Sequence, residues 1–279
     1  MNNSIYPCLW FDGKAGEAAA LYCSIFNKSK VTVDTGMVVN FEIQGQKFMA
    51  LNGGPQYRIN PSISFFVVCE SEAETEAVWK ALADGGSVLM PLDKYEWSEK
   101  YGWVQDRFGV SWQISLGKIP DVGQKITPSM LFVGEQAGKA EQAITFYTSV
   151  FSYSTIGGIL RNGTGQSDPE GTVKHAQFTI NQYVMMATDS SYAHAFAFNE
   201  AVSFVVECET QEEVNFFWEK LTRGGHEGRC GWLKDQFGVS WQIVPTILTT
   251  LMSDPARAKR VVKAFMQMNK FDIVLLEQA

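Results

Sequence analysis

The 279-residue chain carries 23 basic and 30 acidic residues, a net charge of -7, and 46% of it is apolar. Because no basic run offsets this charge, nucleic acid and anionic membrane surfaces are disfavoured as partners. No apolar run of about 18 residues occurs, and the first residues, MNNSIYP, lack a basic or apolar leader region. Five cysteines without CxxC spacing favour reduced thiols, so we expect a cytoplasmic protein.

The first stretch of the chain predicts a unit in which one strand and one helix precede three strands. Apolar alternation and turn residues predict these elements at residues 5–11, 15–26, 30–34, 38–43 and 47–51. Gln44 and Gly45 form a plausible tight turn between the last two strands. The predicted order of this unit is therefore βαβββ.

A second unit follows, with a strand predicted at 63–68. Ser71 and Glu74 form a capping box, which predicts a helix from there to about residue 83. A hairpin then spans 101–115, YGWVQDRFGVSWQIS. Asp106 and Gly109 have the chemistry of its turn.

This hairpin sequence occurs twice, which shows that the chain is a tandem duplication. Residues 101–115 return at 230–244 as CGWLKDQFGVSWQIV, with Asp235 and Gly238 at the turn. The preceding elements return in the same order, with strands and helices predicted at 129–133, 139–151, 202–207 and from the box at Thr210 and Glu213 to 221. We therefore predict domains at 1–120 and 126–246, followed by a helical tail at 247–279.

The two copies have diverged around the hairpin. Fourteen residues precede it in the first copy (87–100), room for a strand and a loop, whereas 226–229 are too few for both. Residues 161–172 predict a polar surface loop in the second copy alone. A cavity present in one copy need not exist in the other.

The tail is predicted to be helical. Asp254 and Pro255 mark a helix start, and a short apolar segment closes the chain at 272–279. Two interpretations stay open: the tail covers its own sheet, or it packs on a partner subunit.

Together these features resemble the vicinal oxygen chelate superfamily of glyoxalase I and the bleomycin-resistance proteins. Within it, the chain is most similar to the PhnB-like group, often labelled 3-demethylubiquinone-9 3-methyltransferase domains. The motifs that carry the resemblance are Phe48-Met49-Ala50, Gly53-Gly54-Pro55, Val88-Leu89-Met90-Pro91-Leu92, Trp97, Gly102-Trp103-Val104, Asp106, Phe108-Gly109 and Trp112. The resemblance implies an α+β fold of two tandem glyoxalase-like domains. Each would be built from paired βαβββ units with a cupped mixed sheet, with helices outside.

The same resemblance implies where a metal would bind. Metal-dependent members of the superfamily place a His on the first strand, a His or Gln on the fifth and a Glu on the last. Here the last-strand positions hold Gln113 and Gln242, and the other positions fall at 6–8, 127–129, 62–64 and 201–203, without a histidine. The three histidines, His175 at a strand start and His194 and His226 in loops, lack ligand spacing. We therefore predict that no metal is bound.

The methyltransferase label implies S-adenosylmethionine, but the sequence does not predict a site for it. Such a cofactor usually lies on a glycine-rich loop between a parallel strand and a helix. Gly157, Gly158, Gly163 and Gly165 lack that context. We expect no cofactor.

The candidate ligand-binding residues are aromatic or polar positions that the resemblance places in the cups. In the first domain, we expect Trp10, Trp97, Tyr101 and Gln113 to line a pocket, with Arg58 and Lys94 as anion partners. The weaker candidates of the second domain are His175, Trp232 and Gln242. The alternative is that the aromatic residues pack a core and the charges form a solvated rim.

Two functions compete. The first is a protein that binds a small apolar or aromatic ligand without a metal. The second is an enzyme of the same superfamily, glyoxalase-, dioxygenase- or isomerase-like or a methyltransferase, acting on a small oxygen-rich substrate. The sequence reveals no nucleophile–base pair, paired acids or phosphate loop, which favours binding. A homodimer is possible, and the two domains could also pair within one chain.

Overall fold

The computed structural model describes residues 3–279, so Met1 and Asn2 of the expected first domain lie outside the described residues. The strands are β1 (Ile5–Phe11), β2 (Ser29–Asp34), β3 (Val38–Ile43), β4 (Gln46–Asn52), β5 (Ile63–Cys69), β6 (Ser87–Tyr95), β7 (Ser98–Gln105), β8 (Ser111–Leu116), β9 (Ile126–Phe132), β10 (Thr155–Arg161), β11 (Val173–Ile180), β12 (Tyr183–Asp189), β13 (Val202–Cys208), β14 (His226–Glu227), β15 (Trp232–Lys234) and β16 (Ser240–Pro245). The helices are α1 (Ala15–Ile25), α2 (Glu72–Ala83), α3 (Ile119–Val122), the 3-10 helix η1 (Gly134–Gln136), α4 (Ala140–Val150), α5 (Gln211–Thr222), α6 (Ile247–Leu251), α7 (Pro255–Phe265) and α8 (Ile273–Gln278). None of the helices formed by residues 3–279 combines the length and apolar character that a membrane crossing requires.

The strands form two mixed sheets of eight strands each, and each sheet takes one βαβββ unit from each copy. Sheet A has the order β14-β15-β16-β13-β1-β4-β3-β2, and sheet B has the order β10-β11-β12-β9-β5-β8-β7-β6. The units join where the first strand of one pairs antiparallel with the first strand of another, β1 with β13 and β5 with β9. This confirms the expected α+β fold of paired units and shows that the two copies pair within one chain.

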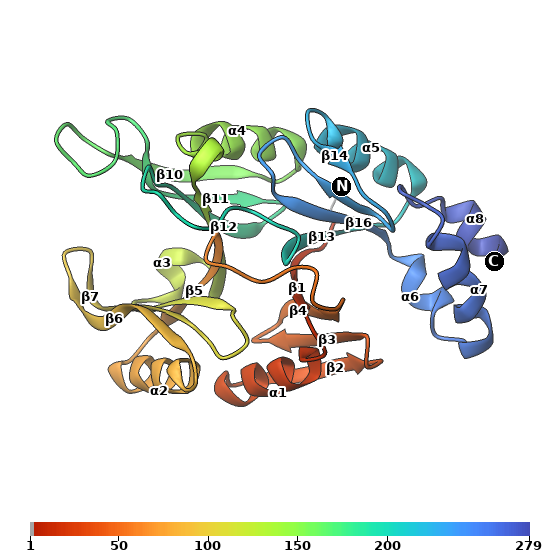
Figure 1. The fold of residues 1–279 in the computed structure, drawn as a ribbon, viewed down its shortest axis with the longest axis horizontal. Coiled ribbons are helices and arrows are strands. Elements are labelled where there is room, and N and C mark those ends of the chain that lie inside the picture. The colour runs from red at the N-terminus through yellow and green to blue at the C-terminus, as the bar shows by residue number, and fades with distance from the viewer. Residues whose placement is uncertain (1–2) are drawn as a thin grey trace.

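Helices lie on two opposite sides of the molecule, with both sheets between them. Figure 1 shows α1 and α2 of the first copy along one border and α4 and α5 of the second copy along the other. The sheet faces that meet these helices are apolar, as the fully buried Phe41, Phe65 and Trp112 illustrate. Each copy contributes one unit to each sheet. Its own helices and aromatic side chains therefore fill the space between those two units.

Each hairpin turn also anchors a helix of the same copy. Asp106 accepts the N–H groups of Phe108 and Val110 through Oδ1, the turn chemistry that the sequence predicts. Its Oδ2 accepts the Trp112 indole N–H at 2.9 Å and the Tyr22 hydroxyl at 2.8 Å. The carboxylate thus joins helix α1 of the first unit to the hairpin of the second. Asp235 repeats this arrangement in the second copy, with Trp241 and Tyr147 as donors.

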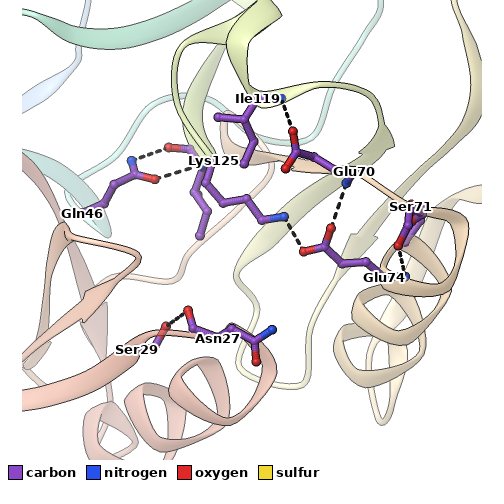
Figure 2. Close-up of polar contacts among 10 residues, drawn as sticks. Asn27, Ser29, Gln46, Glu70, Ser71, Glu74, Ile119 and Lys125 are labelled. Carbon is purple, nitrogen blue, oxygen red and sulfur yellow. Dashed lines mark hydrogen bonds and ion pairs between the residues drawn. The ribbon is translucent and has the colours of Figure 1, made fainter.

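The segment between the copies is held by both units of the first copy (Figure 2). The Gln46 amide at the start of β4 donates to the Ile126 carbonyl and accepts the Ile126 N–H, at 2.7 and 2.9 Å. The Lys125 side chain, 4% exposed, pairs with Glu74 at 2.6 Å. Glu74 in turn accepts the Glu70 N–H at 2.8 Å. These contacts hold the point at which the second copy begins.

Two expectations from the sequence change at strand ends. The strand expected at 129–133 begins at Ile126 instead, because Ile126 and Thr127 pair with Val67 and Phe66 of β5. The expectation that 226–229 are too few for a strand and a loop is wrong. His226 and Glu227, expected in a loop, pair with Lys234 and Leu233. The short turn is possible because Cys230 and Gly231 both adopt positive φ, at 56° and 82°.

The C-terminal tail covers part of the second copy. In the first copy, a Cβ added to Gly102 would lie 2.5 Å from the Trp79 ring of helix α2. At the equivalent Gly231, the nearest ring is that of Phe271 in the tail, also at 2.5 Å. Trp218, the counterpart of Trp79, instead donates to Glu227 at 3.0 Å. Among the residues described, the tail therefore packs on its own chain.

Candidate functional site

Each sheet has a second face, directed away from helices α1, α2, α4 and α5, which we call its cup face. Because side chains alternate along a strand, residues two apart lie on one face. Phe65 and Trp112 point toward the helices, so Ser64, Phe66 and Gln113 belong to the cup face of sheet B.

The cup face of sheet B carries a chain of hydrogen bonds at its centre. The Tyr101 hydroxyl donates to Gln113 Oε1 at 2.8 Å, and Gln113 Nε2 donates to Ser64 Oγ at 2.6 Å. Ser129 of β9 lies directly opposite Ser64, and Met186 of β12 lies beside Ser129. Burial raises the pKa of Tyr101, so its hydroxyl keeps the proton that it donates.

Sheet A repeats this row with different residues. Gln242 Nε2 donates to Ser203 Oγ at 2.9 Å. Cys8 lies opposite Ser203, and Met49 lies beside Cys8. Burial raises the pKa of the Cys8 thiol to about 12, although bonds to Gln242 and Ser203 act in the opposite direction. The thiol is therefore protonated at neutral pH.

Three aromatic rings cover one end of the cup face of sheet A. Trp10 meets Tyr57 and Trp232 edge to face, with ring centroids 5.1 and 5.9 Å apart. Its indole N–H donates to the Gly54 carbonyl at 2.7 Å, which fixes the ring. The position equivalent to Trp10 on sheet B is Leu131, two residues after Ser129 as Trp10 is two after Cys8. Sheet B therefore has a smaller side chain at this end.

Charged residues close the other end of the cup face of sheet A. Lys47 of β4 pairs with Glu207 of β13, and its ammonium lies 4.2 Å from the centre of the Tyr6 ring. The Tyr6 hydroxyl also donates to Glu207, at 3.0 Å. The matching positions on sheet B are uncharged: Thr127, Val184 and Val68. Gln113 is accordingly half-buried, whereas Gln242 is only 6% exposed.

The long β6–β7 hairpin adds aromatic rings beside Gln113. The Tyr95 and Trp97 rings stack with centroids 5.0 Å apart, and both meet Tyr101 edge to face. Trp97 is 63% exposed, so most of its surface is free to contact another molecule. Lys94, in the same hairpin, pairs with Glu99 at 2.7 Å, and both side chains are exposed.

The structure regroups the residues that the sequence places in one pocket. Trp97, Tyr101 and Gln113 share the cup face of sheet B, and His175 of β11 joins them from the second copy. Trp10 lies on sheet A with Trp232 and Gln242, because each unit completes its sheet with a unit from the other copy. Arg58 is exposed in the loop after β4, and its carbonyl accepts from Asn199 at 2.9 Å.

Two of the three histidines lie near one end of the cup face of sheet B. His175 is exposed on β11, yet the surrounding protein removes enough water to lower its pKa. His194 follows β12, and its Nε2 lies 2.9 Å from Ser190 Oγ. A hydroxyl and an imidazole therefore lie within hydrogen-bond distance, a contact that the sequence does not predict. The i, i+4 spacing in a loop gave no helical or motif signal by which this pair could be found.

The implied metal can be tested against the side chains at its positions. On sheet B these are Ser129, Ser64 and Gln113, and on sheet A they are Cys8, Ser203 and Gln242. Divalent ions in such sites take imidazole, carboxylate or thiolate ligands. Residues 3–279 form no group of three His, Cys, Asp or Glu side chains suited to a metal. The side chains at these positions therefore do not fit a divalent metal ion.

The residues expected to bear on S-adenosylmethionine do not fit that cofactor either. Gly157 and Gly158 lie inside the edge strand β10, and antiparallel β11 follows it. Gly163 and Gly165 belong to the loop between these strands. None of the four lies in a turn from a parallel strand into a helix, where a nucleotide cofactor would be held.

The paired βαβββ units and their cup faces define a glyoxalase-like protein of the vicinal oxygen chelate superfamily. One family model, described as 3-demethylubiquinone-9 3-methyltransferase, matches twice, at residues 3–115 and 124–244. The chain belongs to this family. No curated protein matches the chain.

Three solved structures illustrate what the chain is similar to. A PhnB protein from Bacillus cereus is 35% identical over 40% of this chain and 98% of its own, with a TM-score of 0.38. A protein from Pseudomonas aeruginosa is 28% identical over 39% of this chain and 93% of its own, with a TM-score of 0.35. A glyoxalase I variant from Zea mays is 12% identical but covers 87% of this chain and 93% of its own, with a TM-score of 0.55. That last likeness shows that the two-copy fold is shared.

Proposed function

We propose that the chain binds a small molecule with an apolar or aromatic body on the cup face of sheet B, without a catalytic metal. The observation that carries this proposal is the half-buried Gln113, fixed between Tyr101 and Ser64 at 2.8 and 2.6 Å. A primary amide has a second hydrogen and a second lone pair beyond these two bonds. Gln113 thus offers one donor and one acceptor to a neutral ligand.

Aromatic side chains beside Gln113 support an apolar ligand body. Trp103 lies directly across from Gln113 on β7, and its indole N–H is occupied by Ser111 at 2.8 Å. Phe66 and Leu131 are half-buried on the same face. Flat rings gain from stacking on such surfaces. On sheet A the same region is occupied by Trp10 and its neighbours, which makes sheet B the preferred site.

The alternative is an enzyme of the same superfamily that acts on a small oxygen-rich substrate. A single observation favours it, the contact between Ser190 and His194. Arg58 and Lys94 remain proposed partners for an anionic group, although Lys94 already pairs with Glu99.

The first experiment is metal analysis of the purified chain, with thermal shift against Zn, Ni, Mn and Fe(II). We expect neither stoichiometric metal nor stabilisation. A screen of neutral aromatic compounds by thermal shift and tryptophan fluorescence then supplies a ligand. We expect Gln113→Ala to weaken its binding by about tenfold, the loss of one or two hydrogen bonds.

Gln242→Ala is the matched control, because it removes the equivalent amide from sheet A. Unchanged ligand affinity in Gln242→Ala supports the assignment to sheet B. Stoichiometric metal in the wild-type protein, or a loss of affinity confined to Gln242→Ala, would contradict the proposal.

We further propose that residues 1–120 and 126–246 act as two domains of a binding-competent monomer. The support is that one chain supplies both units of each sheet. Light scattering combined with ligand titration tests this, with one ligand per monomeric chain expected. A homodimer that alone binds ligand would overturn it. The five cysteines are free thiols, which supports a reducing, cytoplasmic compartment.

A further inference from the structure

The contact between Ser190 and His194 has the geometry of a nucleophile and its base. Ser190 Oγ and His194 Nε2 are 2.9 Å apart, within the range required for proton transfer. The His194 ring lies with its centroid 4.9 Å from that of Phe196, which restricts its orientation. Ser190 is 7% exposed and His194 is half-buried.

The register of the strands places this pair at the end of the cup face of sheet B. Met186 and Thr188 of β12 lie on that face, and alternation continues to Ser190, which follows the strand. The Ser190 N–H donates to the Phe132 carbonyl at 2.9 Å, so the pairing with β9 persists there. Thr188 lies opposite Leu131. Ser190 therefore adjoins the end of the face at which Leu131 stands in the place of Trp10.

In the first copy, the position equivalent to Ser190 has only a structural role. Its counterpart of Ser190 is Gly53, whose N–H donates to the Phe11 carbonyl at 3.0 Å in the same way. A Cβ on Gly53 would lie 2.2 Å from the Trp10 ring. The fold thus needs no side chain here, and the residue four positions after Gly53 is Tyr57 rather than a histidine. The serine and the histidine therefore occur only in the second copy, which carries Leu131 in the place of Trp10.

We propose that Ser190 is a nucleophile activated by His194, and that the chain uses it on small esters or similar activated acyl compounds bound at the cup face of sheet B. This adds an activity to the binding proposed above, and labelling of the serine does not depend on Gln113.

The chemical step balances without a cofactor. Ser190 Oγ attacks the acyl carbon while His194 Nε2 takes the hydroxyl proton, and an Oγ–acyl bond forms as the bond to the alkoxide breaks. His194 returns the proton to the departing alkoxide. A water molecule then hydrolyses the acyl-serine, with His194 taking and returning a proton again, so that carboxylic acid and alcohol are the products.

The test uses the full chain and diisopropyl fluorophosphate. Attack by Oγ forms a bond to phosphorus, fluoride leaves, and the hydroxyl proton passes through His194. Peptide mass spectrometry is expected to place the adduct on Ser190. We expect His194→Gln, which can still accept a hydrogen bond but is a poor base, to slow labelling at least 100-fold.

Ser191→Ala is the matched control, because Ser191 is the adjacent serine and bonds to Asp168 rather than to a histidine. It is expected to label at the wild-type rate, and Ser190→Ala is expected not to label. Circular dichroism checks that each variant is folded. If a variant is unfolded, the position of the adduct in the wild-type chain still tests the proposal. Absence of an adduct on Ser190, or equal rates in wild type and folded His194→Gln, would overturn the proposal, whatever Gln113→Ala does to ligand binding.

Discussion

The hydroxyl of Tyr147 in helix α4 donates a 2.7 Å hydrogen bond to Asp235, 88 residues away in the hairpin turn. Tyr22 and Asp106 make the same bond in the first copy, at 2.8 Å. In both copies the carboxylate is buried, and it also holds a tryptophan and two turn N–H groups. One side chain therefore ties together both units of a copy.

Replacing Tyr147 by Phe is expected to lower the free energy of unfolding by about 1.5–3 kcal/mol at pH 7, because a buried charged acceptor loses one of its donors. Urea unfolding measures this. Tyr153→Phe is the control, since Tyr153 is 66% exposed, and it should change stability little. Equal effects of the two substitutions would show that the bond to Asp235 contributes nothing.

The pH dependence of stability should carry a signature of Asp235. Burial raises its pKa to about 6, against an ordinary value of 3.8, despite the bonds from Trp241 and Tyr147 that act to lower it. Because the folded-state pKa is raised, the stability that Asp235 contributes is fully present below about pH 4. It is lost as the pH rises through about 6.

The measurement is the difference in unfolding free energy between wild type and Asp235→Asn from pH 4 to pH 7. As the pH rises over this range, we expect the unfolding free energy of the wild type to fall by up to about 3 kcal/mol relative to that of the variant, at 1.36 kcal/mol per pH unit. The difference should level off above pH 7. A difference that stays constant between pH 4 and 6 would contradict a raised pKa.

Gly53→Ala is expected to destabilise the chain by about 1–3 kcal/mol, because the new Cβ would lie 2.2 Å from the Trp10 ring. Combining it with Trp10→Leu recreates the small side chain that Leu131 provides in the other copy. The loss of unfolding free energy in the double variant should therefore be smaller than the sum of the losses in the two single variants. Thermal unfolding of all four proteins measures the coupling. Gly158→Ala is the control, as its Cβ would meet nothing within 4 Å.

Phe271→Ala should release the tail from the second copy. The ring fills the space above Gly231, and truncating a buried Phe typically costs about 3–5 kcal/mol. Hydrogen exchange is expected to accelerate in α7, α8 and β15 and to stay unchanged in sheet B. Leu275→Ala serves as the control, since Leu275 is 51% exposed. Uniform acceleration across the chain would mean that the tail is not a separate unit of stability.

The sequence anticipates local elements well where pattern and turn chemistry act over a few residues. Ser71 and Thr210 cap their helices through the N–H groups of Glu74 and Glu213, as the capping boxes predict. Gln44 and Gly45 both adopt positive φ in the tight turn. The strand at His226 was not predictable from length alone, because its turn depends on an unusual backbone conformation at Cys230.

The site was only partly predictable, because a cup face takes its residues from both copies. The motifs of the first copy indicated Tyr101, Gln113 and Trp97 as candidates, and these residues lie together on sheet B because their strands follow one another in sequence. The separation of Trp10 from Gln113 follows from pairing β1 with β13, a contact between residues almost 200 positions apart. The proximity of Ser190 to His194 depends on the path of an irregular loop, which carries no periodic signal.

The sequence by itself determined the duplication, the βαβββ order, the helix caps and the absence of histidine from the first copy, because each is written in local pattern or composition. Only the tertiary structure decided which units share a sheet, which cup face is filled by Trp10, Tyr57 and Trp232, and which retains Leu131 beside Ser190. The physical reason is that first strands with similar apolar patterns could pair in more than one way. Long-range packing against helices and across the sheets selects among those pairings.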